Sequence, residues 1–106
     1  MEQATENESK ARSILELYDR VKKQVVETTH SQHAIRAVDF LFQHPIFSAP
    51  VFTEHSEIPK PTAGRILQLL RDEMGLLHVL REGKGRRAGI YAFRDLLNIA
   101  EGRKIL

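Results

Sequence analysis

Cysteine is the most informative absence from this sequence of 106 residues. Without cysteine the chain can form no disulfide, thiolate metal site or iron–sulfur cluster, and it offers no thiol nucleophile. No apolar run is longer than about six residues, whereas a membrane-spanning helix requires roughly 20. The first residues, Met1–Ser9, are polar and acidic and lack the apolar stretch of a secretory signal. We therefore expect a cytoplasmic protein with no membrane partner.

The composition is that of a single globular domain with an uneven charge distribution. Hydrophobic residues make up 42% of the chain and charged residues 28%, so we expect one core. Residues 60–94 contain eight Lys or Arg against three Asp or Glu, whereas residues 1–49 contain six against seven. A basic segment of this kind is typical of a surface that binds a polyanion, although surface Lys and Arg are often only solubilising.

The first predicted element is an amphipathic helix over residues 10–29. Its apolar positions recur at alternating steps of three and four, at Ala11, Ile14, Tyr18, Val21, Val25 and Thr28. Leu15, Leu17 and Val26 widen this stripe. The pattern predicts packing against this domain or an upstream one, or self-association through residues 10–29, although a coiled-coil dimer needs three or four clean heptads. Residues 1–9 are expected to be flexible, so residues 10–106 form the predicted domain.

Three further helices are predicted before Gly75. Ser31 is expected to cap a helix over residues 32–43, which ends before Pro45 and directs inward Ala34, Ile35, Ala37, Val38, Leu41 and Phe42. Ser48 is expected to cap a short helix with Pro50 in its first turn and with Val51 and Phe52 in the core. The turn at Ile58–Pro61 leads into a helix over residues 60–74, which buries Ala63, Ile66, Leu67 and Leu70.

After Gly75 the apolar period changes from helical to extended. Residues 76–81 and 88–93 are rich in Leu, Val, Ile and aromatic side chains, and they flank the sequence Glu-Gly-Lys-Gly-Arg-Arg at residues 82–87. This pattern predicts a β-hairpin with a basic tip. Asp95 is expected to cap a last helix over residues 96–101, which ends at Gly102.

The order of these elements is the plan of a winged helix-turn-helix. We therefore predict a mainly α fold with a two-stranded β-hairpin wing and a long N-terminal helix. In this plan the helix after the turn enters the major groove, and the hairpin tip reaches the adjacent backbone. The predicted DNA-binding residues on these two elements are Lys60, Thr62, Arg65, Gln68, Lys84, Arg86 and Arg87. The alternative is a winged helix that mediates protein contacts only.

Catalytic and metal-binding patterns are absent from the sequence. The five histidines lie apart, and only His30 and His33 could share a helix face, without the third ligand and the spacing of a zinc site. Gly83-Lys84-Gly85 lacks the glycine spacing and the Lys-Ser/Thr pair of a phosphate-binding loop. We therefore expect no enzymatic activity, no cofactor and no metal ion.

Several stretches of the sequence resemble the region that follows the catalytic domain in Fic-family proteins. They are Leu17–Arg20, Thr29–Ile35, Gln43–Ser48, Ile58–Leu67 and Ala92–Gly102, and the resemblance covers residues 10–103. Their combination is more specific than any one stretch. The resemblance implies a winged-helix accessory domain of a protein that transfers AMP from ATP to hydroxyl side chains. The expected partner is double-stranded DNA, on the evidence of the basic clusters, or the upstream catalytic domain.

The catalytic motif of the family does not occur in this chain. Fic proteins use a His-Pro-Phe-x-x-Gly-Asn-Gly-Arg sequence, whereas His44-Pro45 is followed here by Ile-Phe-Ser-Ala. The resemblance therefore implies the fold and a regulatory role, without catalysis. In one respect the chain departs from many winged helices, since Pro59 stands where Ser or Thr would cap the recognition helix.

Overall fold

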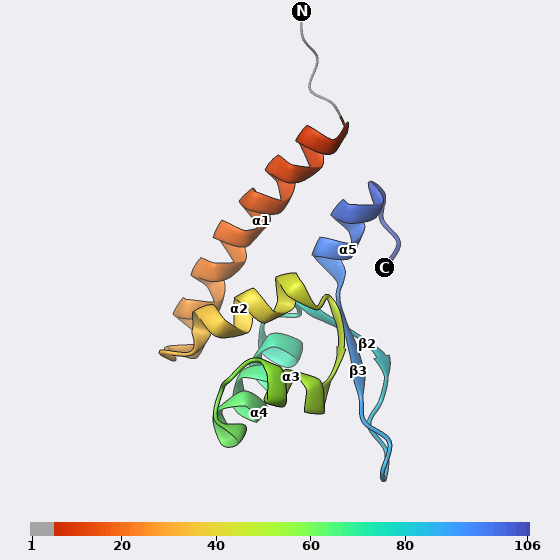
Figure 1. The fold of residues 1–106 in the computed structure, drawn as a ribbon. Helices are drawn as coiled ribbons and strands as arrows, with labels where there is room; N and C mark the ends of the chain where they lie inside the picture. The colour runs from red at the N-terminus through yellow and green to blue at the C-terminus, as the bar shows by residue number, and fades with distance from the viewer. Residues whose placement is uncertain (1–5) are drawn as a thin grey trace, which may run out of the picture.

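The computed structural model describes residues 6–106, with the side chains of residues 8–106. Within that part of the chain, five α-helices, one π-helical segment and three short strands follow one another (Figure 1). In chain order they are α1 (Glu6–Thr29), α2 (Ala34–Gln43), β1 (Ile46–Ser48), α3 (Ala49–His55), α4 (Lys60–Gln68), η1 (Leu69–Glu73), β2 (Leu77–Arg81), β3 (Ile90–Phe93) and α5 (Arg94–Glu101). The predicted class, mainly helical with a small antiparallel β element, is confirmed at this level.

Helix α1 runs along one side of the molecule, where its C-terminal part packs on α2 and its N-terminal part lies beside α5 (Figure 1). The predicted apolar stripe coincides with the buried face only in part. Val21 and Val25 are buried together with Leu17, whereas Ile14, Tyr18 and Thr28 are half-buried and Ala11 is exposed. The helix begins at Glu6, four residues before the start expected at residue 10. Residues 1–5, which the sequence also predicted to be flexible, lie outside the described residues.

Helix α2 begins at Ala34, two residues later than predicted. His33 is its N-cap residue, and the hydroxyl of Ser31 accepts a hydrogen bond from the backbone N–H of His33 (3.0 Å) instead of capping the helix. The prediction that Ile35 points inward is wrong, since it is 41% exposed. The buried face of α2 includes Phe40 instead, which the sequence pattern did not assign to the core.

The sheet has three antiparallel strands in the order β1–β3–β2. The predicted hairpin is confirmed as β2 and β3, but β1 was not predicted and pairs with the other side of β3. In this register Phe47 of β1 and Val79 of β2 both lie opposite Tyr91 of β3, so these three side chains share one face of the sheet. Phe47 and Tyr91 are buried, which shows that this face packs against the core.

The chain between β1 and β2 forms α3, α4 and η1. Ser48 is the N-cap residue of α3 and Pro50 lies in its first turn, as predicted, although the Ser48 hydroxyl makes no capping hydrogen bond. The helix predicted over residues 60–74 starts at Lys60 as expected but changes character after Gln68. In η1 the hydrogen-bond span widens, and the N–H of Met74 bonds to the carbonyl of Leu69 (2.9 Å).

Helix α5 begins at Arg94, one residue before the predicted cap. Phe93 is the N-cap residue, so the expected capping role of Asp95 is wrong. Asp95 lies in the first turn, where its carboxylate stands 3.8 Å from the guanidinium of Arg20 and 3.9 Å from that of Arg94. This acidic group faces the positive end of the helix dipole, so it still favours the start of α5.

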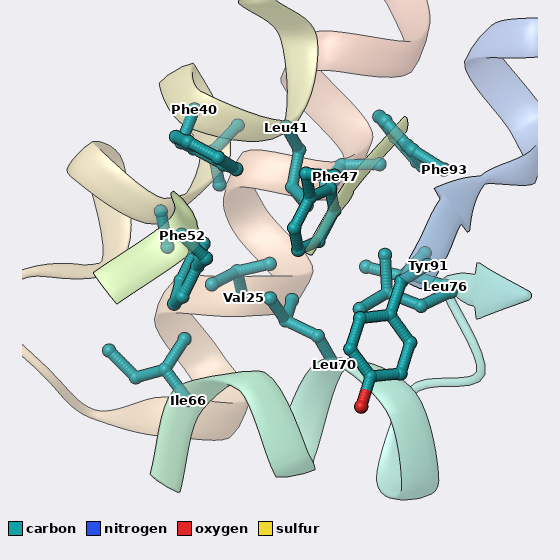
Figure 2. Packing of buried hydrophobic residues seen from close by; sticks show 14 of the residues in the cluster. Val25, Phe40, Leu41, Phe47, Phe52, Ile66, Leu70, Leu76, Tyr91 and Phe93 are labelled. Carbon is teal, nitrogen blue, oxygen red and sulfur yellow. The ribbon is translucent and has the colours of Figure 1, made fainter. Parts of the chain in front are cut away.

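Aromatic side chains from α2, β1 and α3 form the centre of the core (Figure 2). The ring of Phe40 packs edge-to-face against Phe47 and against Phe52, with centroids 5.1 Å apart in both pairs. Ile66 of α4 and Leu70 of η1 complete this side of the core and are fully buried. The cluster therefore fixes the position of α4 relative to the sheet, which sets the geometry of the candidate site.

Candidate nucleic-acid interface

The seven predicted DNA-binding residues lie on two neighbouring features of the fold. One group is on α4, and the other is in the loop between β2 and β3. In Figure 1 the hairpin extends at the same end of the molecule as α3 and α4, opposite to the N-terminal end of α1. The fold therefore presents both groups at one end of the molecule.

The exposed face of α4 carries few side chains that could bond to a duplex. Lys60, Gly64 and Gln68 are exposed and follow one another at steps of four, so they line one side of the helix. Thr62 is half-buried. Gly64 leaves a gap in the middle of this face, since a Cβ atom placed there would meet no atom within 4 Å. The backbone of α4 at Gly64 is therefore accessible to a binding partner, with the ammonium group of Lys60 on one side and the amide of Gln68 on the other.

Arg65 does not project freely from α4. Its Nη2 group donates a hydrogen bond to the backbone carbonyl of Thr29 at the end of α1 (2.9 Å). The last carbonyls of a helix lack intrahelical partners and form the negative end of its dipole, so a guanidinium is well suited to this place. Arg65 therefore links α4 to α1, a role that the sequence pattern did not indicate.

Three other arginines of the basic segment are held by the protein itself. Arg81 donates two hydrogen bonds to the carbonyl of Ala88 (3.2 and 3.0 Å), and Arg94 donates one to the carbonyl of Gly75 (3.2 Å). Arg71 forms a two-pronged ion pair with the neighbouring carboxylate of Asp72. The hydrogen bonds from Arg71 lower the pKa of the Asp72 carboxyl. The side chains of these three arginines therefore face protein partners.

Except for Lys60, the remaining cations of residues 60–94 lie at the hairpin tip. Lys84 and Arg87 pair through two backbone hydrogen bonds (2.9 and 3.0 Å) across a two-residue loop. Gly85 occupies the first loop position with a φ of +61°, a conformation that glycine adopts at little cost. Lys84, Arg86 and Arg87 are exposed, and within residues 6–106 their side chains have no hydrogen-bond or ion-pair partner.

An open pocket of about 450 Å³ lies where α3 meets the start of α4. It is lined by Ala49, Pro50, Thr53, Glu54 and Lys60. The hydroxyl of Thr53 is already used, because it donates to the carbonyl of Ala49 (3.2 Å). The pocket places Lys60 at the rim of a hollow beside α3, so its ammonium group is accessible from outside.

Other kinds of site find little support in the described residues. Among them, no three His, Cys, Asp or Glu side chains come close enough together to hold a metal ion. No helix in this part of the chain combines the length and the apolar character needed to cross a membrane. A scan against protein-family models, a search of curated proteins and a search of solved structures find no match to this chain.

Proposed function

We propose that this chain is a winged helix-turn-helix module that binds double-stranded DNA. The elements α2, α3, α4, β2 and β3 follow one another in the order of the predicted plan, with the unpredicted strand β1 between α2 and α3. In this proposal α4 is the recognition helix and the β2–β3 hairpin is the wing. The short strand β1 joins the wing to the helical part by pairing with β3. In this arrangement α4 faces the major groove while the wing tip contacts phosphates beside it.

The observation that carries this proposal is the position of the cations that the protein does not use internally. Residues 60–94 contain eight Lys and Arg residues. Four of them donate hydrogen bonds to other groups of the protein: Arg65, Arg71, Arg81 and Arg94. The other four, Lys60, Lys84, Arg86 and Arg87, are exposed at the start of α4 and at the wing tip. Free cations at the two elements that would straddle a duplex are what phosphate binding requires.

The two groups would have different tasks at a duplex. Flexible cations at the wing tip suit phosphate contacts, which supply affinity without reading sequence. On α4, Thr62 and Gln68 offer a hydroxyl and an amide to base edges, and Lys60 offers an ammonium group. Arg65 has further N–H groups beyond the one bonded to Thr29, but its first task is to position α4.

We further propose that the module belongs to a Fic-type AMP-transferring protein, in which it is regulatory and non-catalytic. This assignment rests on the stretches from Leu17 to Gly102 that resemble the region after the Fic catalytic domain. The chain contains only one His-Pro pair, His44-Pro45, and no Gly-Asn-Gly-Arg sequence to hold phosphates. Any AMP transfer would therefore come from another domain.

A protein-interaction module is the second candidate. It is favoured by apolar side chains on the two edge strands, where Ile46 of β1 is 55% exposed and Leu80 of β2 is 47% exposed. Edge strands offer unpaired backbone groups beside these side chains, which suits docking of another protein. Such docking would bury apolar area and would depend little on salt.

A duplex titration at about 50 mM and about 200 mM salt separates the two candidates, because counterion release makes phosphate binding fall steeply with salt. We expect the double variant Arg86→Ala/Arg87→Ala to weaken binding to every duplex and to reduce the salt slope by about 2 units at most. The matched control is Arg103→Ala/Lys104→Ala, which removes the same charge beside α5, away from the wing (Figure 1). The control should leave the slope nearly unchanged. No measurable affinity of the unmodified chain at the lower salt concentration would refute DNA binding and favour the protein-interaction module.

A further inference from the structure

A second face of α1 remains exposed after the helix has packed on α2 and α5. It contains residues at alternating steps of three and four: Arg12, Leu15, Asp19, Lys22 and Val26. Four of them are exposed, and Lys22, at the edge of this face, is half-buried. Leu15 is 67% exposed and Val26 is 42% exposed. They are two of the three residues that widened the predicted apolar stripe of the helix; the third, Leu17, is buried. We call these five residues the outer stripe.

The outer stripe is complementary to itself when two copies of α1 pack antiparallel. A twofold axis between Arg20 and Val21 places Leu15 opposite Val26 of the second copy, and the symmetry repeats this contact at the other end. The same axis places Asp19 opposite Lys22 of the second copy, again twice. Two apolar contacts therefore flank two pairs of opposite charge.

The alternative, parallel orientation lacks this match. It would place Asp19 against Asp19 and Lys22 against Lys22, so both charged positions would repel. In the antiparallel pair, Arg12 also approaches the C-terminal end of the other helix, where the dipole is negative. The charge pattern of the stripe therefore selects one orientation.

We propose that the outer stripe is a dimerisation surface for a second copy of this chain, with the two α1 helices antiparallel. The interface does not involve α4 or the wing, so it does not depend on the proposed DNA binding. The stripe is shorter than the three or four heptads of a stable coiled coil, so the association is expected to be weak.

Sedimentation equilibrium over a range of concentrations tests this surface with charge reversals in the full chain. Asp19→Lys turns both opposite-charge pairs into Lys–Lys pairs and is expected to weaken dimerisation about tenfold. Lys22→Asp has the same effect through Asp–Asp pairs. The double variant Asp19→Lys/Lys22→Asp restores the pairs with exchanged signs and is expected to dimerise like the unmodified chain. Lys104→Asp is the matched control, since it reverses an exposed charge outside α1.

Thermal melting followed by circular dichroism distinguishes variants that lose stability from variants that lose only dimerisation. Lys22 also lies over the ring of Tyr18 (5.6 Å to its centroid), so Lys22→Asp is expected to lower the melting temperature slightly on its own. A chain that remains monomeric at all concentrations overturns the proposal. So does a dimer that Asp19→Lys leaves intact, or a folded double variant that fails to recover association.

Discussion

Replacement of Gly64 by alanine tests how α4 is oriented in the fold. Gly64 lies inside α4, on the side exposed to solvent, and a Cβ atom added there meets no atom within 4 Å. Alanine is more favourable than glycine in a helix interior by about 0.8–1.0 kcal/mol, largely because it restricts the unfolded chain. No packing or collision alters this balance at position 64. We therefore expect Gly64→Ala to raise the free energy of unfolding by about 1 kcal/mol.

Gly75 provides a matched control for this substitution. A Cβ atom at Gly75 also meets nothing within 4 Å, but φ there is +62°. A residue with a side chain pays about 1–2 kcal/mol in this left-handed conformation. Gly75→Ala is therefore expected to lower stability, although the available space is the same. The two variants differ only in the backbone conformation that the new methyl group must accept.

Thermal melting and urea unfolding followed by circular dichroism measure both changes. For a domain of this size, 1 kcal/mol corresponds to a shift in melting temperature of about 4–8 °C. We expect an increase for Gly64→Ala and a decrease for Gly75→Ala. A lower melting temperature for Gly64→Ala would mean that this side of α4 packs against another part of the protein. That result would refute the orientation on which the proposed DNA-binding face depends.

Three further predictions follow from contacts described above. Arg65→Ala is expected to lower the free energy of unfolding by about 1 kcal/mol through loss of the bond to Thr29, whereas Gln68→Ala should change it by less than about 0.5 kcal/mol; equal effects in urea unfolding would contradict the linking role. The hydrogen bond to Asp39, aided by burial, raises the pKa of Tyr18, so its stabilising effect is present below the unfolded pKa of about 10 and is lost as the pH rises through the folded pKa. Ultraviolet absorbance measured against pH follows tyrosine ionisation. If the Tyr18→Phe variant still showed the tyrosine with the raised pKa, the assignment of that pKa to Tyr18 would be wrong. Incubation with labelled ATP and candidate proteins is expected to show no AMP transfer; labelling that disappears in His44→Ala would contradict the non-catalytic assignment.

The helices and the hairpin were predictable because their burial follows simple periods. The stripe of α1 and the apolar strands around the basic loop each recur several times along the chain, so one misplaced residue does not obscure the pattern. Ile35 shows where this fails. Ile35 is apolar and adjoins the buried Ala34, but with about 3.6 residues per turn it lies outside the face that Ala34, Ala37 and Leu41 form, so it points outward.

Two parts of the fold could not be predicted from local patterns. Strand β1 has only three residues directly after Pro45, and its partner β3 lies more than 40 residues further along the chain. Its pairing therefore depends on tertiary contacts that leave no local period. The widening of the helix at η1 is equally hidden, because Leu70 is buried whether the turn is α or π.

The residue types of the candidate site could be predicted from the sequence, but the hydrogen bonds that their side chains form within the protein could not. The sequence locates the basic segment and its two exposed parts, and in the structure Lys60, Arg65, Gln68, Lys84, Arg86 and Arg87 are exposed. It does not reveal that Arg65 is bonded to the end of α1, because the partner is a backbone carbonyl 36 residues away. Backbone acceptors are present at every position, so no sequence pattern marks the one that an arginine will choose.

The strand order β1–β3–β2 has a consequence for how the chain folds as it is synthesised. The central strand is the last of the three in the sequence, so the two edge strands emerge from the ribosome before the strand that joins them. Until residue 93 has emerged, Phe47 lacks Tyr91, its cross-strand neighbour, and the apolar faces of both edge strands remain exposed. Pairing of β1 with β3 closes a long loop, which makes sheet completion a late and comparatively slow event. The contacts between α1 and α2 join residues nearer in sequence, so these helices can pack together before the sheet is complete. Their packing buries part of the apolar surface while β3 is still being synthesised.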